Sequence, residues 1–204
     1  MCGRYTLIAN AEAIRLLFEL PAFDERLVVP RYNIAPTQPI AVVRVGPKGQ
    51  RELIPVRWGL IPAWAKDPKT LPLMINARAE TVAEKPAYRW AFKYRRCLVP
   101  ASGFYEWQAQ GRGPKQPYLA SAGPVTPEGN SLIAFAGLWE TFLGADGSEI
   151  DTAAIVVSNA NERLAPIHDR MPVIIAPKDF EAWLSNETDL EDLTTLMKPA
   201  PDDR

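Results

Sequence analysis

The chain has 204 residues, of which 47% are hydrophobic, and its net charge is −1. This length fits one domain with a substantial core. No stretch reaches the apolar length of a transmembrane helix, and the N-terminus lacks the hydrophobic region of a signal peptide, so we expect a soluble, cytoplasmic protein without a membrane partner. The two cysteines are too few for a disulfide framework or a zinc site, and we expect no metal and no cofactor.

Charge is distributed unevenly along the chain. Residues 1–118 contain 18 Lys and Arg against 9 Asp and Glu, whereas residues 119–204 contain 5 against 15. A basic front half is typical of a surface that binds a polyanion, although an ordinary dipolar surface gives the same counts.

The chain begins Met-Cys-Gly-Arg, and an initiator Met before a small residue is normally removed. The mature chain would then start at Cys2, with its α-amine and thiol on adjacent carbons. Such a 1,2-aminothiol can attack an acyl carbon with its own amine as base, or capture an aldehyde as a thiazolidine. We expect the cation of Arg4 to lower the pKa of the thiol. The alternative is that Cys2 is an incidental residue on a frayed terminus.

The first elements expected are a strand at residues 3–8 and a helix at residues 10–20, where apolar residues recur at helical spacing. Residues 30–39 contain three prolines and are expected to form a rigid loop, because proline disfavours helix interiors and central strands. Residues 40–45 and 51–56 are expected to pair as a hairpin.

Two segments combine aromatic and basic side chains. Trp58 and Trp64 lie beside Gly and Pro residues and could stack on unpaired bases, each stacked base contributing roughly 1–3 kcal/mol. Alternatively, these tryptophans cover an edge of the core. Residues 88–96 interleave four aromatic residues with four cations, which is typical of a nucleic-acid face or of a helix with an aromatic inner side and a basic outer side.

Asn76 and Arg78 lie two residues apart, so in an extended segment their side chains leave on the same face. An amide and a guanidinium on one face could grip a phosphate or orient a reacting group. The alternative is a cap together with a surface ion pair to Glu80.

Two further residues are candidates for proton transfer. Glu106 is flanked by aromatic residues in a strand-like run, and desolvation there would raise the pKa of its carboxyl toward neutrality. An exposed strand glutamate is the alternative. His168 is the only histidine of the chain and lies between two charged residues, where it could be catalytic or structural.

The remaining pattern indicates the fold class. Short strands, few helices and long proline-rich connections favour an α+β fold, because strands and helices do not alternate. Cys97 is expected to be a buried structural thiol. Residues 108–130 are expected to be loops around a short strand, followed by strands at 132–138 and 153–157 with a turn at 144–147, and by helices at 179–184 and 188–197.

Six motifs, in this order, resemble the SOS response-associated peptidase (SRAP) family. They are Met-Cys-Gly-Arg-Tyr at the start, Arg-Tyr-Asn-Ile-Ala-Pro-Thr at 31–37, Arg-Trp-Gly-Leu at 57–60, Ile-Asn-Ala-Arg-Ala-Glu-Thr at 75–81, Gly-Phe-Tyr-Glu-Trp at 103–107 and Ile-His-Asp-Arg-Met-Pro at 167–172.

The resemblance implies a single domain over residues 1–204 with a barrel-like, mixed or antiparallel β core flanked by a few helices. Members of the family generally continue past the last helix into a segment with a Pro-Val-Ser and a Val-Asn pattern. This chain ends at Arg204 without that pattern, so we expect the C-terminal segment of the family to be missing.

The resemblance also implies a protein that recognises abasic sites in single-stranded DNA and becomes covalently joined to them. It would act as a monomer in the cytoplasm, associated with the nucleoid when bound to DNA. The family's catalytic residues match Cys2, Asn76, Glu106 and His168. The DNA-binding positions expected are Arg4, Asn33, Pro36, Trp58, Trp64, Arg78 and Arg170.

This function agrees with the chemistry of the residues, since an opened abasic deoxyribose presents an aldehyde and a 1,2-aminothiol traps aldehydes. We expect Asn76 to hold the Cys2 amine, Glu106 to shuttle protons, and His168 to orient or protonate the departing sugar oxygen. The peptidase activity would be self-directed removal of Met1, although a general aminopeptidase could also remove it.

Two other functions remain open. Type II glutamine amidotransferases also begin Met-Cys-Gly, but the motifs expected for binding glutamine are not visible and the basic aromatic segments would be unexplained. The second alternative is a non-covalent reader of single-stranded or modified DNA in which Cys2 has no role.

Overall fold

The computed structural model describes residues 2–126, 128 and 131–202. The strands are β1 (Tyr5–Leu7), β2 (Arg31–Ile34), β3 (Pro39–Val45), β4 (Arg51–Trp58), β5 (Asn76–Arg78), β6 (Arg96–Ala101), β7 (Gly103–Gln108), β8 (Gln116–Ala120), β9 (Ile133–Leu143), β10 (Glu149–Asn159), β11 (Arg170–Pro172) and β12 (Ile174–Ile175). The α-helices are α1 (Ala11–Phe18), α2 (Arg89–Tyr94), α3 (Phe180–Leu184) and α4 (Leu190–Leu196). Short 3-10 helices lie at Glu25–Val28, Pro68–Thr70 and Pro177–Asp179.

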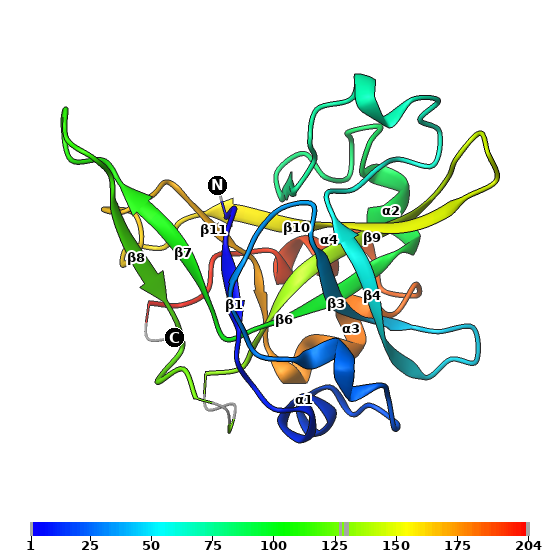
Figure 1. The fold of residues 1–204 in the computed structure, drawn as a ribbon, viewed down its shortest axis with the longest axis horizontal. Coiled ribbons are helices and arrows are strands. Elements are labelled where there is room, and N and C mark those ends of the chain that lie inside the picture. Colours follow the sequence, from blue (N-terminus) through cyan, green and yellow to red (C-terminus); the bar gives the residue numbers. More distant parts are fainter. Residues whose placement is uncertain (1, 127, 129–130, 203–204) are drawn as a thin grey trace.

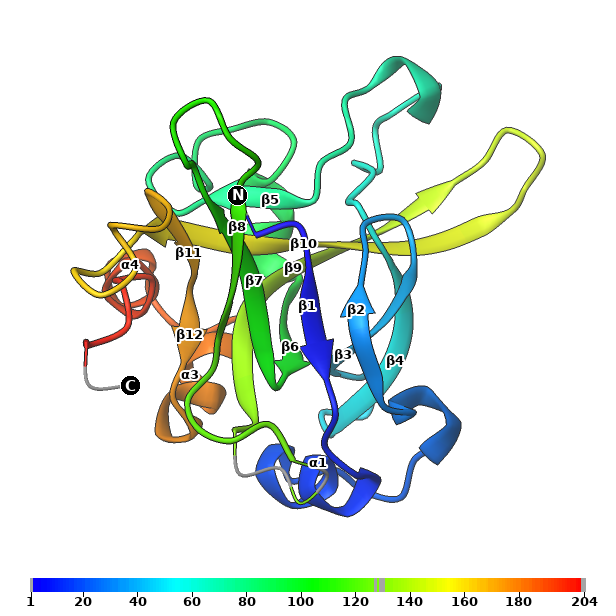
Figure 2. The same ribbon diagram turned by 60° about the vertical axis from the view of Figure 1, so that its left-hand side comes forward.

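Five strands close into a barrel in the order β4, β3, β6, β9 and β10 (Figures 1 and 2). β10 closes the ring by pairing in parallel with β4, and the other barrel neighbours are antiparallel. The expected α+β fold, with a barrel-like β core and a few flanking helices, is confirmed. In the described part of the chain, every helix is too short or too polar to cross a membrane.

The burial pattern at the centre of β10 reflects its place in the barrel. Residues 153–157 are all buried, because one face of the strand lies inside the barrel and the other is covered by neighbouring elements. A strand covered on both faces has a continuous apolar run rather than an alternating pattern. This run predicted the strand correctly, but not its full length.

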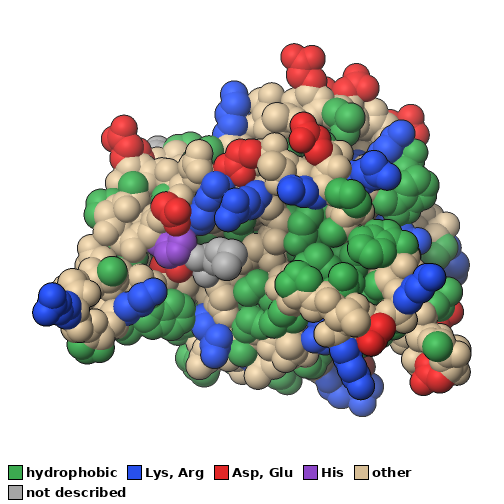
Figure 3. Space-filling view, turned by 90° about the horizontal axis from the view of Figure 1, so that it is seen from above, with side chains coloured by type: hydrophobic (Ala, Val, Ile, Leu, Met, Phe, Trp, Pro, Cys, Tyr) green, Lys and Arg blue, Asp and Glu red, His purple; other side chains and the backbone are tan. Residues whose placement is uncertain are grey.

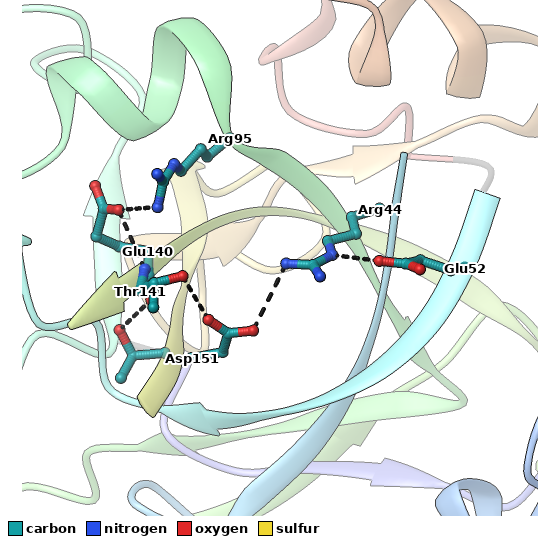
Figure 4. Close-up of polar contacts among 7 residues, drawn as sticks. Arg44, Glu52, Arg95, Glu140, Thr141 and Asp151 are labelled. Atoms are coloured by element: carbon teal, nitrogen blue, oxygen red, sulfur yellow. Dashed lines mark hydrogen bonds and ion pairs between the residues drawn. The ribbon is translucent and has the colours of Figure 1, made fainter. Parts of the chain in front are cut away.

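β9 and β10 extend beyond the strands expected at 132–138 and 153–157, because polar residues at their ends pair with each other (Figure 4). Arg44 forms ion pairs with Glu52 at 2.7 Å and with Asp151 at 3.6 Å. Thr141 donates a hydrogen bond to Asp151 at 2.6 Å, and the Arg44 guanidinium lies 4.2 Å from the centre of the Trp139 ring. These contacts allow polar side chains from four barrel strands to meet at one end of the barrel.

A second sheet has the order β2, β1, β7 and β8. Ser102, between β6 and β7, is the corner through which the chain passes from the barrel into this sheet. Its backbone N–H donates to the Thr6 carbonyl oxygen at 2.7 Å, and its Oγ accepts from the Ile8 N–H at 3.0 Å. Two nearly continuous strands therefore connect the barrel rigidly to the second sheet.

The expectation of a rigid loop at residues 30–39 is partly wrong. Arg31–Ile34 form β2 at the edge of the second sheet, and Pro39 begins β3. Pro30 and Pro36 lie just outside β2, so neither interrupts its hydrogen bonds.

The helices cover the ends and sides of the barrel. Asn10 caps α1 through its side chain, which accepts a hydrogen bond from Ala13 N–H at 2.8 Å, as its sequence position favours. Phe18 on the buried face of α1 stacks on Phe180 of α3, with ring centres 5.2 Å apart. The helix ends at Phe18 because Glu19 adopts a left-handed conformation with φ of 52°.

Candidate active site

The start of the chain lies against β7. Tyr5 is paired with Phe104, and the Tyr105 N–H donates to the Arg4 carbonyl oxygen at 2.9 Å. Continuing this antiparallel register places Gly3 opposite Glu106. The Cys2 side chain is fully buried, and its thiol interacts electrostatically with the Glu106 carboxyl. Met1, whose removal we expect, lies outside the described residues.

Glu106 faces inward because its neighbours on β7 alternate across the sheet: Phe104 and Glu106 are buried, whereas Trp107 is exposed. Only 4% of Glu106 is exposed. Burial raises the pKa of its carboxyl, and the nearby His168 ring lowers this pKa by a smaller amount. The expectation of a raised pKa is confirmed, and the alternative of an exposed strand glutamate is wrong.

His168 lies two residues before β11 and reaches toward Glu106. Its Nε2 is 3.9 Å from Glu106 Oε2, and its Nδ1 accepts the Arg170 backbone N–H at 2.9 Å. In the neutral ring this second contact leaves the proton on Nε2, facing Glu106. Asp169 Oδ1 lies 3.0 Å from Nδ1, so a protonated ring would have a carboxylate on each side. The ring is thus placed to give a proton to this site or to take one from it.

Asn76 begins β5, which pairs in parallel with β10. Both polar atoms of its side-chain amide are buried and have no hydrogen-bond partner within the described residues. Its backbone carbonyl, in contrast, accepts a hydrogen bond from the Tyr88 hydroxyl at 3.0 Å. Buried amide groups without partners are rare and costly, so this amide is available for a ligand.

One expectation about Cys2 is wrong for the folded chain. We expected the Arg4 cation to lower the pKa of the thiol, but burial and then the negative charge of Glu106 raise this pKa well above its ordinary value. Arg4 contributes through its backbone N–H, which lowers the pKa less, while its guanidinium donates to the Gly3 carbonyl oxygen. The thiol is therefore held in its protonated form.

Arg78 and Arg170 lie on strands that flank β10. Val157 of β10 is paired with Arg78 on one side, and Asn159 is paired with Arg170 on the other. Arg78 is exposed, whereas Arg170 forms an ion pair with Glu80. The surface pair that we considered between Arg78 and Glu80 is replaced by this one.

The expected stacking residues differ in their surroundings. Trp58 is fully buried, its indole N–H donates to the Ile75 carbonyl oxygen at 3.0 Å, and its ring packs edge-on against Tyr5. The expectation that Trp58 stacks on bases is therefore wrong for this structure, because no face of the ring is accessible. The other expected positions are Asn33 and Trp64, which are exposed, and Arg4 and Pro36, which are partly buried.

Sequence reasoning missed two residues that hold the site together. Gln108 donates from its side chain to the Pro166 carbonyl oxygen at 2.8 Å, which ties β7 to the turn before His168. Tyr88 fixes the backbone at Asn76. Each hydrogen bond joins residues that are not sequence neighbours, so no local sequence pattern predicts it.

A cavity of about 630 Å³ lies elsewhere and is lined mainly by apolar residues of β8, β9, β12 and the 161–167 turn. None of the expected site residues lines it.

Within the described ranges, no group of three His, Cys, Asp or Glu side chains could hold a metal ion. Figure 3 shows the histidine (purple) on the face that also carries several basic side chains (blue).

Comparison with known proteins gives a consistent result. The family described as SOS response associated peptidase (SRAP) matches residues 1–204. The chain is 39% identical over 201 residues to the abasic site processing protein YoqW of Bacillus subtilis, covering 98% of this chain and 87% of that protein. It is 32% identical over 169 residues to the abasic site processing protein HMCES of Xenopus tropicalis, covering 74% of this chain and 50% of that protein.

Solved structures agree with the fold. A protein from Bacteroides thetaiotaomicron superposes with a TM-score of 0.87 at 23% identity, covering 99% of this chain and 89% of that one. A protein from Bordetella bronchiseptica superposes with a TM-score of 0.81 at 26% identity, covering 100% and 96%.

Proposed function

The chain belongs to the SOS response associated peptidase family, and we propose that it captures abasic sites in single-stranded DNA as a covalent adduct of Cys2. The names of its relatives support abasic-site processing as the general activity. The arrangement around Cys2 supports the particular chemistry.

The observation that carries the proposal is the group formed by Cys2, Glu106 and His168. A buried thiol near the start of the chain interacts with a buried carboxyl of raised pKa, and an imidazole lies 3.9 Å from that carboxyl. Raising the pKa of a carboxyl makes it a stronger general base, which suits the proton transfers of a reaction at an aldehyde. Removal of Met1 would add an α-amine to this group.

Each step of the proposed reaction balances in atoms. The opened abasic deoxyribose presents a C1′ aldehyde, and the Cys2 amine adds to it and expels water to form an imine. The Cys2 sulfur then adds to the imine carbon while its proton passes to the imine nitrogen, which closes a five-membered thiazolidine. Glu106 would carry protons between these atoms and water, and His168 would protonate the sugar oxygen that departs on ring opening.

Asn76 has the role of a positioning group in this scheme. Its amide oxygen and nitrogen are buried without partners in the described chain. The oxygen can accept from the Cys2 amine, and the nitrogen can donate to a sugar or phosphate oxygen. A single amide could thus hold both reactants.

The strand would be held through its phosphates and bases. Arg78, Arg170 and Arg4 supply cations near the site, and affinity should fall as salt concentration rises. Exposed Trp64, with Pro36 and Asn33, would contact the neighbouring nucleotides.

Removal of Met1 would be either autocatalytic or the work of an aminopeptidase. The protein would act as a monomer in a reducing cytoplasm, associated with the nucleoid when bound to DNA.

The test is intact mass spectrometry after mixing the protein with a single-stranded oligonucleotide that carries one abasic site. We expect an adduct of protein lacking Met1 plus DNA minus one water, which survives heating. Cys2→Ala should form no such adduct, whereas Cys97→Ala, which alters the other buried free cysteine, should form it normally.

Other outcomes would replace the proposal. No adduct from protein whose Met1 is absent would exclude capture by Cys2. Glutamine hydrolysis lost in Cys2→Ala would then indicate an amidotransferase. Reversible binding that is equal in the wild type and in Cys2→Ala would indicate a non-covalent reader.

A further inference from the structure

We propose that the exposed rings of Trp90 and Tyr94 form an aromatic face that continues the base contact proposed above for Trp64 and stacks on further unpaired bases of the bound strand, outside the reacting site. The inference deepens the proposed function, because the ligand is the same single-stranded DNA. None of the residues that we assign to the reaction belongs to this face.

The rings are arranged as a platform. Trp90 and Tyr94 are 58% and 38% exposed, and they lie one turn apart on α2 with ring centres 4.4 Å apart. The buried residues of α2 are Ala91 and Phe92, so the two exposed rings lie outside the core. Trp64 is 59% exposed.

Hydrogen bonds link this face to the candidate active site. The Trp64 indole N–H reaches the Pro86 carbonyl oxygen at 3.4 Å, shortly before α2. Tyr88, the residue directly before α2, donates to the Asn76 carbonyl oxygen. A strand whose abasic sugar contacts Asn76 would therefore have neighbouring nucleotides within reach of the aromatic face.

The charge of the segment favours a nucleic acid as the occupant. Lys85, Arg89 and Lys93 are exposed, and the ion pairs within the described residues involve none of them. Lys93 Nζ lies 5.0 Å from the centre of the Tyr94 ring. Figure 3 shows hydrophobic side chains (green) next to basic side chains (blue) on the same face as the histidine (purple). Rings interleaved with uncompensated cations match stacked bases and their phosphates.

The first test measures reversible binding to an undamaged oligothymidylate of about 20 nucleotides by fluorescence anisotropy. We expect Trp90→Ala/Tyr94→Ala to bind at least about tenfold more weakly than wild type, because the variant loses its contacts with two stacked bases together. Trp90→Phe/Tyr94→Phe keeps the rings and should restore most of the affinity. Leu16→Ala, on an exposed apolar residue of α1, is the matched control and should bind as the wild type does.

The second test requires no stable alanine variant. Oligothymidylate should quench the tryptophan fluorescence of the wild type, and Trp90→Phe should lose part of this quenching. Affinity unchanged in the double alanine variant, or quenching unchanged in Trp90→Phe, overturns the proposal.

The two proposals can fail separately. Binding to undamaged DNA does not involve the thiol of Cys2, so a protein that forms no adduct can still show stacking at Trp90. Conversely, the wild type can form the adduct while the double alanine variant binds undamaged DNA as tightly as the wild type does. That result would leave the proposed reaction standing and rule out the aromatic face.

Discussion

The Tyr88 hydroxyl donates a hydrogen bond to the backbone carbonyl oxygen of Asn76, 3.0 Å away. The bond joins the start of α2 to the first residue of β5, and it fixes the backbone that carries a side-chain amide without hydrogen-bond partners in the described chain. Burial raises the pKa of Tyr88, so the hydroxyl remains a donor throughout the neutral range.

Removing that hydroxyl should affect the reaction more than the stability. Tyr88→Phe keeps the ring but leaves the Asn76 carbonyl without this donor, at a cost of about 1 kcal/mol. We expect the rate of adduct formation to fall by about fivefold to tenfold, because Asn76 is less well fixed. The rate should be measured at saturating DNA alongside the melting temperature. A rate equal to that of the wild type would show that the bond does not position Asn76.

Glu106 should destabilise the fold at neutral pH while serving the reaction. The pKa of its carboxyl is higher in the folded protein than in the unfolded chain, because burial disfavours the charged form. The stabilising contribution is therefore complete below the ordinary glutamate pKa of 4.5 and is lost as pH rises through the folded value. Above that folded value the protein bears the cost of a buried charge.

Glu106→Gln should accordingly raise the melting temperature by about 2–4 °C at pH 7.5, and this difference should disappear near pH 4. The same variant should form the adduct at least about 100-fold more slowly. Glu12→Gln is the control, since that exposed carboxyl is paired with Arg15 and its pKa is lowered. A Glu106→Gln protein that melts below the wild type at neutral pH would contradict this account.

Arg44 should be important for the stability of the barrel end shown in Figure 4. Arg44→Met removes the cation shared by Glu52 and Asp151 and leaves two carboxylates facing each other. We expect a loss of about 1–3 kcal/mol, seen as a melting temperature lower by about 5 °C. The triple variant Arg44→Met/Glu52→Gln/Asp151→Asn should recover most of the loss. If the triple variant is as unstable as the single one, packing on Trp139 rather than charge explains the effect.

Glu80 should moderate DNA binding, because it forms an ion pair with Arg170 next to the site. Glu80→Gln frees one cation, so affinity for single-stranded DNA should rise severalfold and the slope of log affinity against log salt should steepen by about one unit. Glu84→Gln changes an exposed carboxylate nearby and should have a smaller effect. Weaker binding by Glu80→Gln would mean that the ion pair instead holds Arg170 in the orientation that DNA requires.

Local sequence patterns predicted the elements that depend on local chemistry. The hairpin of β3 and β4, the Asn10 cap and the final two helices lie close to their expected positions, because turns, caps and apolar periodicity act over a few residues. The ends of β9 and β10 could not be predicted, since their polar residues are satisfied only by partners on other strands.

The site was predicted in part for the same reason. Glu106 has a local signal, its aromatic neighbours, and its burial follows from strand alternation. The sequence neighbours of Trp58 are those expected of an exposed stacking residue. Only the closed barrel places Trp58 in the core. The contacts of Gln108 and Tyr88 cross 58 and 12 residues, and sequence spacing alone says nothing about them.

The corner at Ser102 has a consequence for how the lesion reaches the thiol. Glu106 lies four residues beyond that corner, on a strand continuous with the barrel and hydrogen-bonded to β1 and β8. Backbone hydrogen bonds therefore anchor the strand that carries this carboxyl to the barrel. We therefore expect the protein site to keep its conformation while the DNA rearranges. The sugar that has lost its base would rotate out of the strand toward Cys2.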